Sequence, residues 1–366
     1  MVKGQGGKKL LLSLFALGVM ILILFAIGGF LLMDRPQSKV IEDQDSTQNS
    51  KILYEVRKKM SVGAIAKDLQ AKHLISHPLA FRYFVKLTGQ EKKIRSGFYF
   101  LPQNNSVLEM TYLLTTGKMA TRSVTIPEGV TSWEIYSILK RYYPIDSLSF
   151  DSLVHAPDFT KSLGIEAPSL EGYLFPETYA LPFEINERQI LTHLVGGFTK
   201  ATNAMNKESE VIRKYGVNGW VTLASIVEEE AAVSSEQSRI ASVFYNRLVQ
   251  GWSLGADPTV RFILKKPTGP LFVSDLNVNS PYNTRRFTGL PPGPICNPGR
   301  KALLAALNPP RTDNMFFVAK DNGSREHFFS ATNSEHNRYK EKAMENREAK
   351  GAPVLISTPK KKPRMK

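Results

Sequence analysis

The feature that most constrains the fold is an uncharged run near the N-terminus. Residues 10–33 read LLLSLFALGVMILILFAIGGFLLM, without a single charged side chain. A helix of about 20 apolar residues crosses the hydrocarbon core of a bilayer. A cleaved signal peptide has a shorter apolar core, of about 7 to 15 residues, and a small-residue cleavage site, whereas this run continues into DRP. The sequence therefore predicts an uncleaved transmembrane helix over residues 10–33.

The charges on either side of this run predict its orientation. Lys3, Lys8 and Lys9 precede it, whereas the residues that follow it carry acids as well as bases. Positive charge is retained on the cytoplasmic side of a membrane span. We therefore expect residues 1–9 to form a cytoplasmic tail. The rest of the chain would lie outside the cytoplasm, in the periplasm, as part of a single-pass protein of the cell (inner) membrane.

Composition limits the class of the exported part. Hydrophobic residues make up 42% of the chain, enough for the core of one large or two modest domains. The single cysteine, Cys296, excludes a disulfide within the chain. The net charge is +15, and part of it lies in a basic tail, residues 346–366, which we expect to be disordered. A basic chain often binds nucleic acid, but outside the cytoplasm lipid head groups or cell-wall polymer are the expected anionic partners.

A short pattern recurs after a polar linker, residues 34–51. The runs KILYEV, SGFYFL and RSVTIP have strand character. Each precedes a hydroxyl residue, Ser61, Ser106 or Thr131, with apolar residues four and eight positions later. Glu109 and Glu134 complete capping boxes with the second and third of these. Residues 52–122 are thus predicted to be an α/β subdomain, either ordinary α+β supersecondary structure or a small glycan-binding module of the LysM type.

The amino-acid composition changes after Pro127. Residues 123–345 are predicted to form a second, mixed α+β domain. Several stretches combine Gly, Pro and Asn with aromatic residues: SLEGYLFPETYAL, GADPTVRF, NSPYNTRRFTGLPPGPICNPG and EHFFSATNSEHN. Loops of this kind can shape a cleft, in which aromatic faces stack on sugar rings and polar side chains match hydroxyls and acetamides. Taken singly, each stretch also fits a plain turn.

The run LASIVEEEAAV, residues 223–233, places three glutamates directly after an apolar segment. Three consecutive acids on a helix are commonly a solvated face. A helical projection puts Glu229 opposite an apolar stripe that includes Trp220 and Val227, and puts Glu228 and Glu230 on its flanks, each about 80° from the centre. Desolvation on a flank raises the pKa of a carboxyl toward that of a useful general acid. Periodicity alone therefore leaves two candidates for chemistry, Glu228 and Glu230.

Taken in order, the motifs resemble those of the endolytic murein transglycosylases, the YceG-like or MltG family. They are IPEGVTSWEI, LEGYLFPETY, LASIVEEEAAV, ASVFYNRL, DPTV, YNTR with TGLPPGPICNPG, and the spaced H, FS, T and EHN near residue 337. The resemblance implies an N-terminal transmembrane helix, a LysM-like α/β subdomain and a mixed α+β catalytic domain. It also selects the first glutamate after ASIV, Glu228, as the catalytic acid. Family members commonly have EKE where this chain has EEEA, so Glu229 takes no role from the resemblance, and the basic tail lies beyond it.

The reaction that the resemblance implies is non-hydrolytic cleavage of the β-1,4 bond between N-acetylmuramic acid and N-acetylglucosamine in nascent glycan strands. It would leave 1,6-anhydromuramyl ends and terminate strand elongation, with no cofactor. Glu171 would either orient substrate or anchor a turn. The other candidates for the cleft wall are Tyr173, Asp257, Thr259, Tyr282, Asn283, Thr284, His327, His336 and Asn337.

The sequence also bears on two other classes of protein, metal-dependent enzymes and non-enzymatic scaffolds. His327, Glu335 and His336 lack the helical spacing of a zinc site, so no metal is expected. The alternative function is a non-enzymatic protein, whose first subdomain binds peptidoglycan glycan and whose second domain docks peptidoglycan synthases. A scaffold of this kind would tolerate loss of Glu228.

Overall fold

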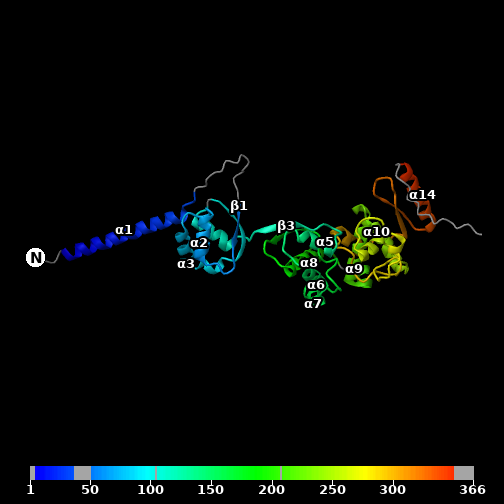
Figure 1. The fold of residues 1–366 in the computed structure, drawn as a ribbon, viewed down its shortest axis with the longest axis horizontal. Coiled ribbons are helices and arrows are strands. Elements are labelled where there is room, and N and C mark those ends of the chain that lie inside the picture. The colour runs from blue at the N-terminus through cyan, green and yellow to red at the C-terminus, as the bar shows by residue number, and fades with distance from the viewer. Residues whose placement is uncertain (1–4, 37–50, 104, 207, 350–366) are drawn as a thin grey trace, which may run out of the picture. The chain divides into compact units, whose positions relative to one another are not determined.

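The computed structural model describes residues 5–36, 51–103, 105–206 and 208–349 of the 366-residue chain (Figure 1). In the first helix, the side chains of residues 5–13 and 16 are not described. Much of the predicted linker, 34–51, and of the predicted basic tail, 346–366, lies outside the described residues, as do residues 1–4 of the predicted cytoplasmic tail.

The chain divides into two compact units. Unit 1 comprises residues 1–123 and 180–184, and unit 2 comprises residues 124–179 and 185–366. The predicted boundary between residues 122 and 123 lies next to this division. The return of residues 180–184 to unit 1 was not indicated by the sequence, because it depends on contacts between distant parts of the chain.

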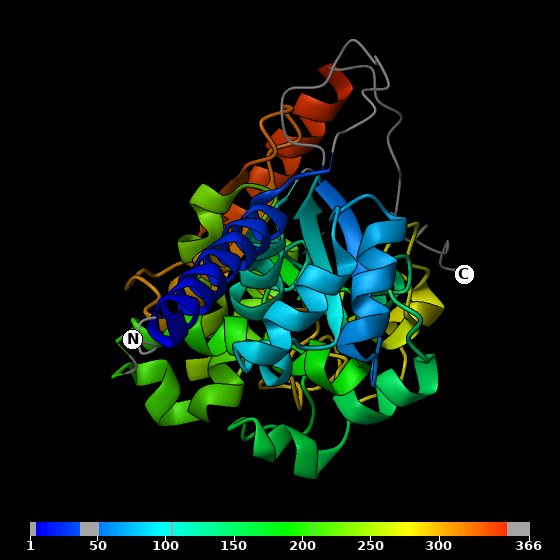
Figure 2. The same ribbon diagram turned by 90° about the vertical axis from the view of Figure 1, so that its left-hand side faces the viewer.

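Unit 1 contains a β-α-α-β arrangement. In chain order its elements are β1 (Lys51–Val56), α2 (Val62–Ala71), α3 (Pro78–Leu87), a 3-10 turn η1 (Gln90–Lys93), β2 (Gly97–Pro102) and α4 (Val107–Thr116). The two strands pair antiparallel, with Lys51 opposite Pro102 and Val56 opposite Gly97, and lie side by side in Figure 2. Buried residues from every one of these helices and strands form one core, for example Tyr54, Leu69, Phe81, Tyr99 and Met110.

The predicted strands and helix caps of this region are confirmed. The run KILYEV is β1, SGFYFL overlaps β2, and RSVTIP overlaps β3 (Thr121–Thr125). Ser61 Oγ accepts the N–H of Ala64 at 3.2 Å, and Ser106 and Glu109 form the predicted capping box. The recurring unit, a strand followed by a capped helix, is present as β1–α2, β2–α4 and β3–α5 (Ser132–Leu139). The three copies are not arranged alike, because β1 pairs with β2, whereas β3 pairs with β4 (Thr178–Pro182).

The first helix of unit 1, α1, spans Gln5–Met33. Beyond its end, Asp34 Oδ2 lies 3.0 Å from His77 Nε2, and Arg35 Nη2 lies 2.6 Å from Glu109 Oε1. Among the residues described, no helix combines the length and the apolar character needed to cross a membrane. The transmembrane helix over residues 10–33 therefore remains a prediction.

Unit 2 is a mixed α+β structure, as predicted, and most of it is helical. Strands β3 and β4 each contribute residues to both units. The elements that lie wholly in unit 2 are α5 (Ser132–Leu139), α6 (Ser147–Val154), α7 (Pro157–Ser162), α8 (Glu187–Asn203), α9 (Glu210–Glu230), η2 (Ser234–Glu236), α10 (Gln237–Val249), α11 (Asp257–Leu264), α12 (Val273–Leu276), α13 (Arg300–Leu307), β5 (Phe316–Ala319), β6 (His327–Ser330) and α14 (Asn333–Ala349). Strands β5 and β6 pair antiparallel, and α14 packs against both. Helix α9 packs against α10, α11 and α13, so it lies at the centre of this unit.

Candidate active site

The candidate site lies at the C-terminal end of α9, inside unit 2. Gly216 breaks the helical backbone with φ 71° and ψ 179°, and every residue from Gly219 to Val227 is buried. The indole N–H of Trp220 donates to the carbonyl oxygen of Leu303 at 2.8 Å. The predicted single apolar stripe is therefore wrong, because this part of α9 packs against neighbours on all its sides.

Glu228, Glu229 and Glu230 form the last residues of this helix. The carbonyl groups at a helix C-terminus carry partial negative charge, which disfavours a carboxylate there. Desolvation by burial is the largest cause that raises the pKa of all three carboxyls, to about 7 for Glu229 and Glu230. All three acids are therefore shifted toward the protonated form, which is the state that a proton donor needs near neutral pH.

Glu228 is held by the backbone of Gly299. The N–H of Gly299 donates to Glu228 Oε2 at 2.9 Å. Burial and then the nearby Glu128 carboxyl raise the pKa of Glu228, and the Gly299 N–H lowers it. A side chain on Gly299 would run into the carboxyl of Glu128, so both acids lie against this glycine. In the described part of the chain, Oε1 of Glu228 has no hydrogen-bond partner.

A cavity of about 200 Å³ opens beside these acids. Its lining includes three carboxyls, one guanidinium and two aromatic rings: Glu128, Glu134, Glu229, Arg261, Trp133 and Phe262. Glu229 is the most exposed of the three glutamates of α9, as periodicity predicted, and it lines this cavity. Desolvation, then Glu134 and Glu228, raise the pKa of Glu229. The prediction that Glu229 faces away from the core is confirmed, and the structure adds that Glu229 lines this cavity.

Gly129 brings the loop after β3 close to both neighbouring glutamates. It has φ +79°, a conformation that residues with a side chain rarely adopt. A Cβ atom there would lie 2.9 Å from Glu229 Oε1 and 3.7 Å from Glu228 Cγ. Because Gly129 also lines the cavity, Glu228 lies immediately behind the cavity wall.

Three aromatic side chains extend from the cavity in a row. The ring centroids of Trp133 and Phe262 are 5.2 Å apart, and those of Phe262 and Tyr282 are also 5.2 Å apart. The ammonium group of Lys265 lies 5.4 Å from the centroid of Trp133. Tyr282, a predicted cleft residue, is half-buried here, and burial raises the pKa of its hydroxyl. Rows of this kind present flat apolar faces, on which sugar rings can stack.

Beneath the cavity, Glu171 and Asn297 join three loops. The carboxylate of Glu171 accepts the backbone N–H of Ser132 at 3.2 and 3.0 Å and the amide of Asn297 at 2.8 Å. Asn297 Oδ1 accepts the N–H of Leu174 at 2.8 Å, and its amide also donates to the carbonyl of Val130 at 2.9 Å. Glu171 and Asn297 are both buried. Glu171 therefore anchors a turn in this structure, and a role in orienting substrate stays a prediction.

The segment that carries Glu171 is fixed by its neighbours as well. Gly172 has φ +87°, and a side chain there would run into Pro294. Tyr173 was predicted to line the cleft, but it is buried, with its hydroxyl donating to Asn218 Oδ1 at 3.2 Å and its ring edge-on to that of Phe198. Tyr173 therefore packs in the core and does not line a cleft.

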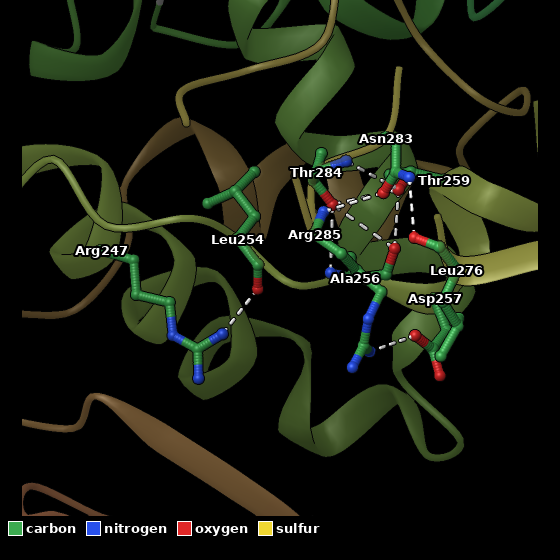
Figure 3. Close-up of polar contacts among 9 residues, drawn as sticks. All are labelled: Arg247, Leu254, Ala256, Asp257, Thr259, Leu276, Asn283, Thr284 and Arg285. Atoms are coloured by element: carbon green, nitrogen blue, oxygen red, sulfur yellow. Dashed lines mark hydrogen bonds and ion pairs between the residues drawn. The ribbon is translucent and has the colours of Figure 1, made fainter. Parts of the chain in front are cut away.

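Thr259, Asn283 and Thr284, also predicted for the cleft wall, are buried and bonded to one another's loops (Figure 3). Thr259 Oγ1 donates to the carbonyl of Ala256 at 2.7 Å and lies 3.0 Å from Thr284 Oγ1. The amide of Asn283 donates to the carbonyls of Leu276 and Val278 at 3.0 and 2.8 Å. Their polar atoms hold residues 276–284 against the start of α11. Contact of these side chains with substrate stays a prediction.

This scaffold presents an exposed ion pair between Asp257 and Arg285, with Oδ1 and Nη1 2.5 Å apart (Figure 3). Glu230 lies within their electrostatic reach. Desolvation and then Asp257 raise the pKa of Glu230, while Arg247 and Arg285 lower it. Arg247 in turn donates to the carbonyls of Leu254 and Met315. The flank of α9 that carries Glu230 therefore faces a charged network, whereas the flank that carries Glu228 faces the cavity wall.

His327, His336 and Asn337 lie on β6 and α14. His327 Nδ1 is 2.7 Å from Glu236 Oε2, and its ring is largely buried. The ring of His336 stacks on Phe316, and burial lowers its pKa. Asn337 is exposed. Among the described residues, no hydrogen bond or ion pair joins these three side chains to the glutamates of α9, and no group of His, Cys, Asp and Glu is arranged to hold a metal ion.

Sequence reasoning missed several residues of this site. Glu134 was assigned only to a helix cap, and its carboxylate does accept the N–H of Thr131 at 2.9 Å, yet it also lines the cavity. Glu128, Trp133, Phe262 and Asn297 had no assigned role. The available signal was that all four lie in the quoted motifs, but that position does not show which side chains meet.

Known proteins similar to this chain agree on one family. The model of the YceG-like family matches residues 54–342. An endolytic murein transglycosylase of Bacillus subtilis is 33% identical over 342 residues, covering 88% of this chain and 92% of the relative. One from Streptococcus pneumoniae is 27% identical, and this chain spans about half of its length, 52%. The crystal structure of a putative YceG-like protein from Listeria monocytogenes has a TM-score of 0.54 and 30% identity, covering 80% of this chain and 99% of that protein.

Proposed function

Because the chain belongs to the YceG-like family, we propose that it is an endolytic peptidoglycan lytic transglycosylase. The observation that carries this proposal is the Glu228 carboxyl, which has a raised pKa and one oxygen fixed by a backbone N–H beside an acidic, aromatic cavity. The reaction would cleave the β-1,4 bond between N-acetylmuramic acid and N-acetylglucosamine in nascent strands. It would leave 1,6-anhydromuramyl ends and so terminate elongation.

A single carboxyl can perform both proton transfers of this reaction. Since Gly299 donates to Oε2, the acidic proton of neutral Glu228 is placed on Oε1. Glu228 protonates the departing glycosidic oxygen, and the resulting carboxylate then removes the proton of the muramyl C6 hydroxyl, which closes the anhydro ring. Water is not consumed. The neighbouring Glu128 carboxyl favours the protonated starting state of Glu228.

The aromatic row is the surface that we assign to the sugar rings. Trp133, Phe262 and Tyr282 offer successive flat faces beside the cavity, and Arg261 offers a donor to the carboxyl or acetamide of a muramyl residue. Asp257 remains a candidate at the edge of the cleft, since it is exposed. Glu171, Thr259, Asn283 and Thr284 support the site from within the fold.

We also propose that α1 anchors the protein in the cell (inner) membrane with its N-terminus in the cytoplasm. The support is the uncharged run of residues 10–33, the three lysines before it, and the exposure of apolar side chains along α1, such as Phe15, Leu22 and Phe25. A reporter that is active only outside the cytoplasm, fused after Lys366, should then be active. Activity of a reporter that works only in the cytoplasm would contradict this topology.

For unit 1 we propose a LysM-like role in binding glycan strands. Its β-α-α-β order and capped helices support that reading. The competing proposal is a scaffold that binds glycan and docks peptidoglycan synthases without cleaving anything. Incubating the purified chain with uncrosslinked glycan strands separates the two, because mass spectrometry distinguishes anhydro ends from hydrolytic ends. Anhydro products support the transglycosylase, hydrolytic products contradict the mechanism, and intact strands favour the scaffold.

A further inference from the structure

Helix α3 exposes a stripe of large apolar side chains. Leu79, Tyr83 and Leu87 recur every fourth residue and are 64%, 58% and 86% exposed. On the opposite side of the helix, Phe81 and Val85 are fully buried in the core of unit 1. An exposed row of apolar side chains on a well-packed helix is typical of a surface that contacts a membrane or another protein.

Basic side chains lie next to this stripe. Arg82 and Lys86 of α3, with Lys67 of α2, line a cavity of about 520 Å³, which also takes in Leu79. The first turn of α2, Ser61–Ala64, forms another part of its wall, so backbone N–H groups add positive potential. Glu91 is an acid in the lining, and among the described residues no salt bridge joins an acid to any of the three bases. The cavity is therefore suited to an anionic group.

The end of α1 is tied to the start of α3. His77, the residue before α3, has its Nε2 3.0 Å from Asp34 Oδ2, and Asp34 follows α1 directly. Leu32 of α1 packs against the core of unit 1, and Figure 1 shows α1 reaching this unit beside α3. If α1 crosses the bilayer, α3 starts at the level where the chain leaves it.

We propose that the stripe Leu79, Tyr83 and Leu87, with Lys67, Arg82 and Lys86, is a docking surface for anionic phospholipid. This inference rests on the proposed membrane anchor. Apolar and aromatic side chains flanked by bases are the pattern of helices that lie in the membrane interface, where the bases meet lipid phosphates. Two exposed leucines offer a glycan no hydrogen bond and only a poor stacking face, which favours lipid over glycan as the occupant of this surface. Docking would hold unit 1 against the outer face of the cell (inner) membrane.

The chain offers a clean way to test this contact. Its single cysteine, Cys296, is fully buried, so a cysteine introduced at the surface can be labelled selectively. Leu87→Cys, labelled with an environment-sensitive fluorophore in the full chain, should show blue-shifted emission in vesicles of phosphatidylcholine and phosphatidylglycerol. Quenching by spin-labelled lipid should exceed quenching by aqueous iodide. The matched control is Leu53→Cys, an exposed leucine on β1, which should show the reverse.

A charge variant tests the bases. Each base near an anionic surface contributes about 1 kcal/mol, or roughly fivefold in the docked-to-undocked ratio. Arg82→Ala with Lys86→Ala should therefore lower that ratio roughly thirtyfold and remove the preference for phosphatidylglycerol over phosphatidylcholine vesicles. Lys92→Ala with Lys93→Ala, which changes the charge equally outside the cavity lining, should have a smaller effect.

The outcomes separate this inference from the anchor. If the wild-type chain does not float with vesicles, the proposal that α1 is a membrane anchor is contradicted, and so is the docking surface that rests on it. If the chain floats but the label at residue 87 stays accessible to iodide, the docking surface alone is overturned. If the Arg82 and Lys86 variant loses binding to purified glycan strands and keeps its lipid contact, the cavity is a glycan site instead.

Discussion

Replacing Asn297 with alanine should destabilise unit 2 by about 3 to 5 kcal/mol. Its buried side chain bonds to Leu174, Val130 and Glu171 at 2.8 to 2.9 Å, and it has no exposed surface. A net hydrogen bond contributes about 0.5 to 1.5 kcal/mol, and each buried partner left unpaired costs about 1 to 3 kcal/mol. Three lost partners in one site therefore place this substitution among the most damaging single changes.

Urea unfolding followed by tryptophan fluorescence measures this loss in the intact chain. Trp133, Trp220 and Trp252 all lie in unit 2, so the signal reports that unit. The matched control is Asn337→Ala, at an exposed asparagine, which should change the free energy of unfolding by less than about 0.5 kcal/mol. A loss below about 1 kcal/mol for Asn297→Ala would refute the view that this residue joins the loops of the site.

Three further outcomes are expected. Gly129→Ala should lower turnover by up to about a hundredfold, because its Cβ would displace a carboxyl of the site; Gly164→Ala, with a similar φ of +75° and open space, should leave turnover near wild type. Trp133→Leu should raise KM for glycan strands more than it lowers kcat in steady-state assays, whereas Trp252→Leu should change neither. Because the folded-state pKa of Glu230 is raised to about 7, the stability it contributes is complete below its unfolded pKa and is lost as pH rises through 7. The urea midpoint should therefore be lower at pH 8 than at pH 5, and equal midpoints at the two pH values would contradict the raised pKa of Glu230.

The features that sequence predicted well are those set by neighbours along the chain. The strand KILYEV and the capping box of Ser106 and Glu109 follow from local spacing, and both are present. Sequence also predicts the raised pKa of Glu228 and Glu230, from desolvation on the two flanks of an apolar stripe, and the pKa of both is raised. In the structure the largest cause is desolvation of these carboxyls at the end of α9, directly after the fully buried residues 219–227.

The parts that sequence could not predict depend on burial and on distant partners. Thr259, Asn283 and Thr284 have the side-chain chemistry of a cleft wall, and only the fold shows that their polar atoms are used internally. Asn297 bonds to loops more than a hundred residues earlier, which no local pattern indicates. A helical projection places Glu229 on the side of α9 away from the core, but it cannot show that the loop around Gly129 lines a cavity with it.

In the proposed mechanism Glu228, the first of three consecutive acids, performs the proton transfers. Glu228→Gln keeps the shape of the side chain but removes the titrating proton, which is worth about 10² to 10⁴ in rate. Purified Glu228→Gln, Glu229→Gln and Glu230→Gln would each be given uncrosslinked glycan strands, with folding checked by tryptophan fluorescence and 1,6-anhydromuramyl ends counted by mass spectrometry. We expect Glu228→Gln to fold and to form almost no anhydro ends, while Glu229→Gln and Glu230→Gln keep measurable turnover. If Glu228→Gln keeps near wild-type turnover and Glu230→Gln loses turnover, Glu230 is the catalytic acid instead. If all three variants keep full turnover, none of the three glutamates of α9 is the catalytic acid.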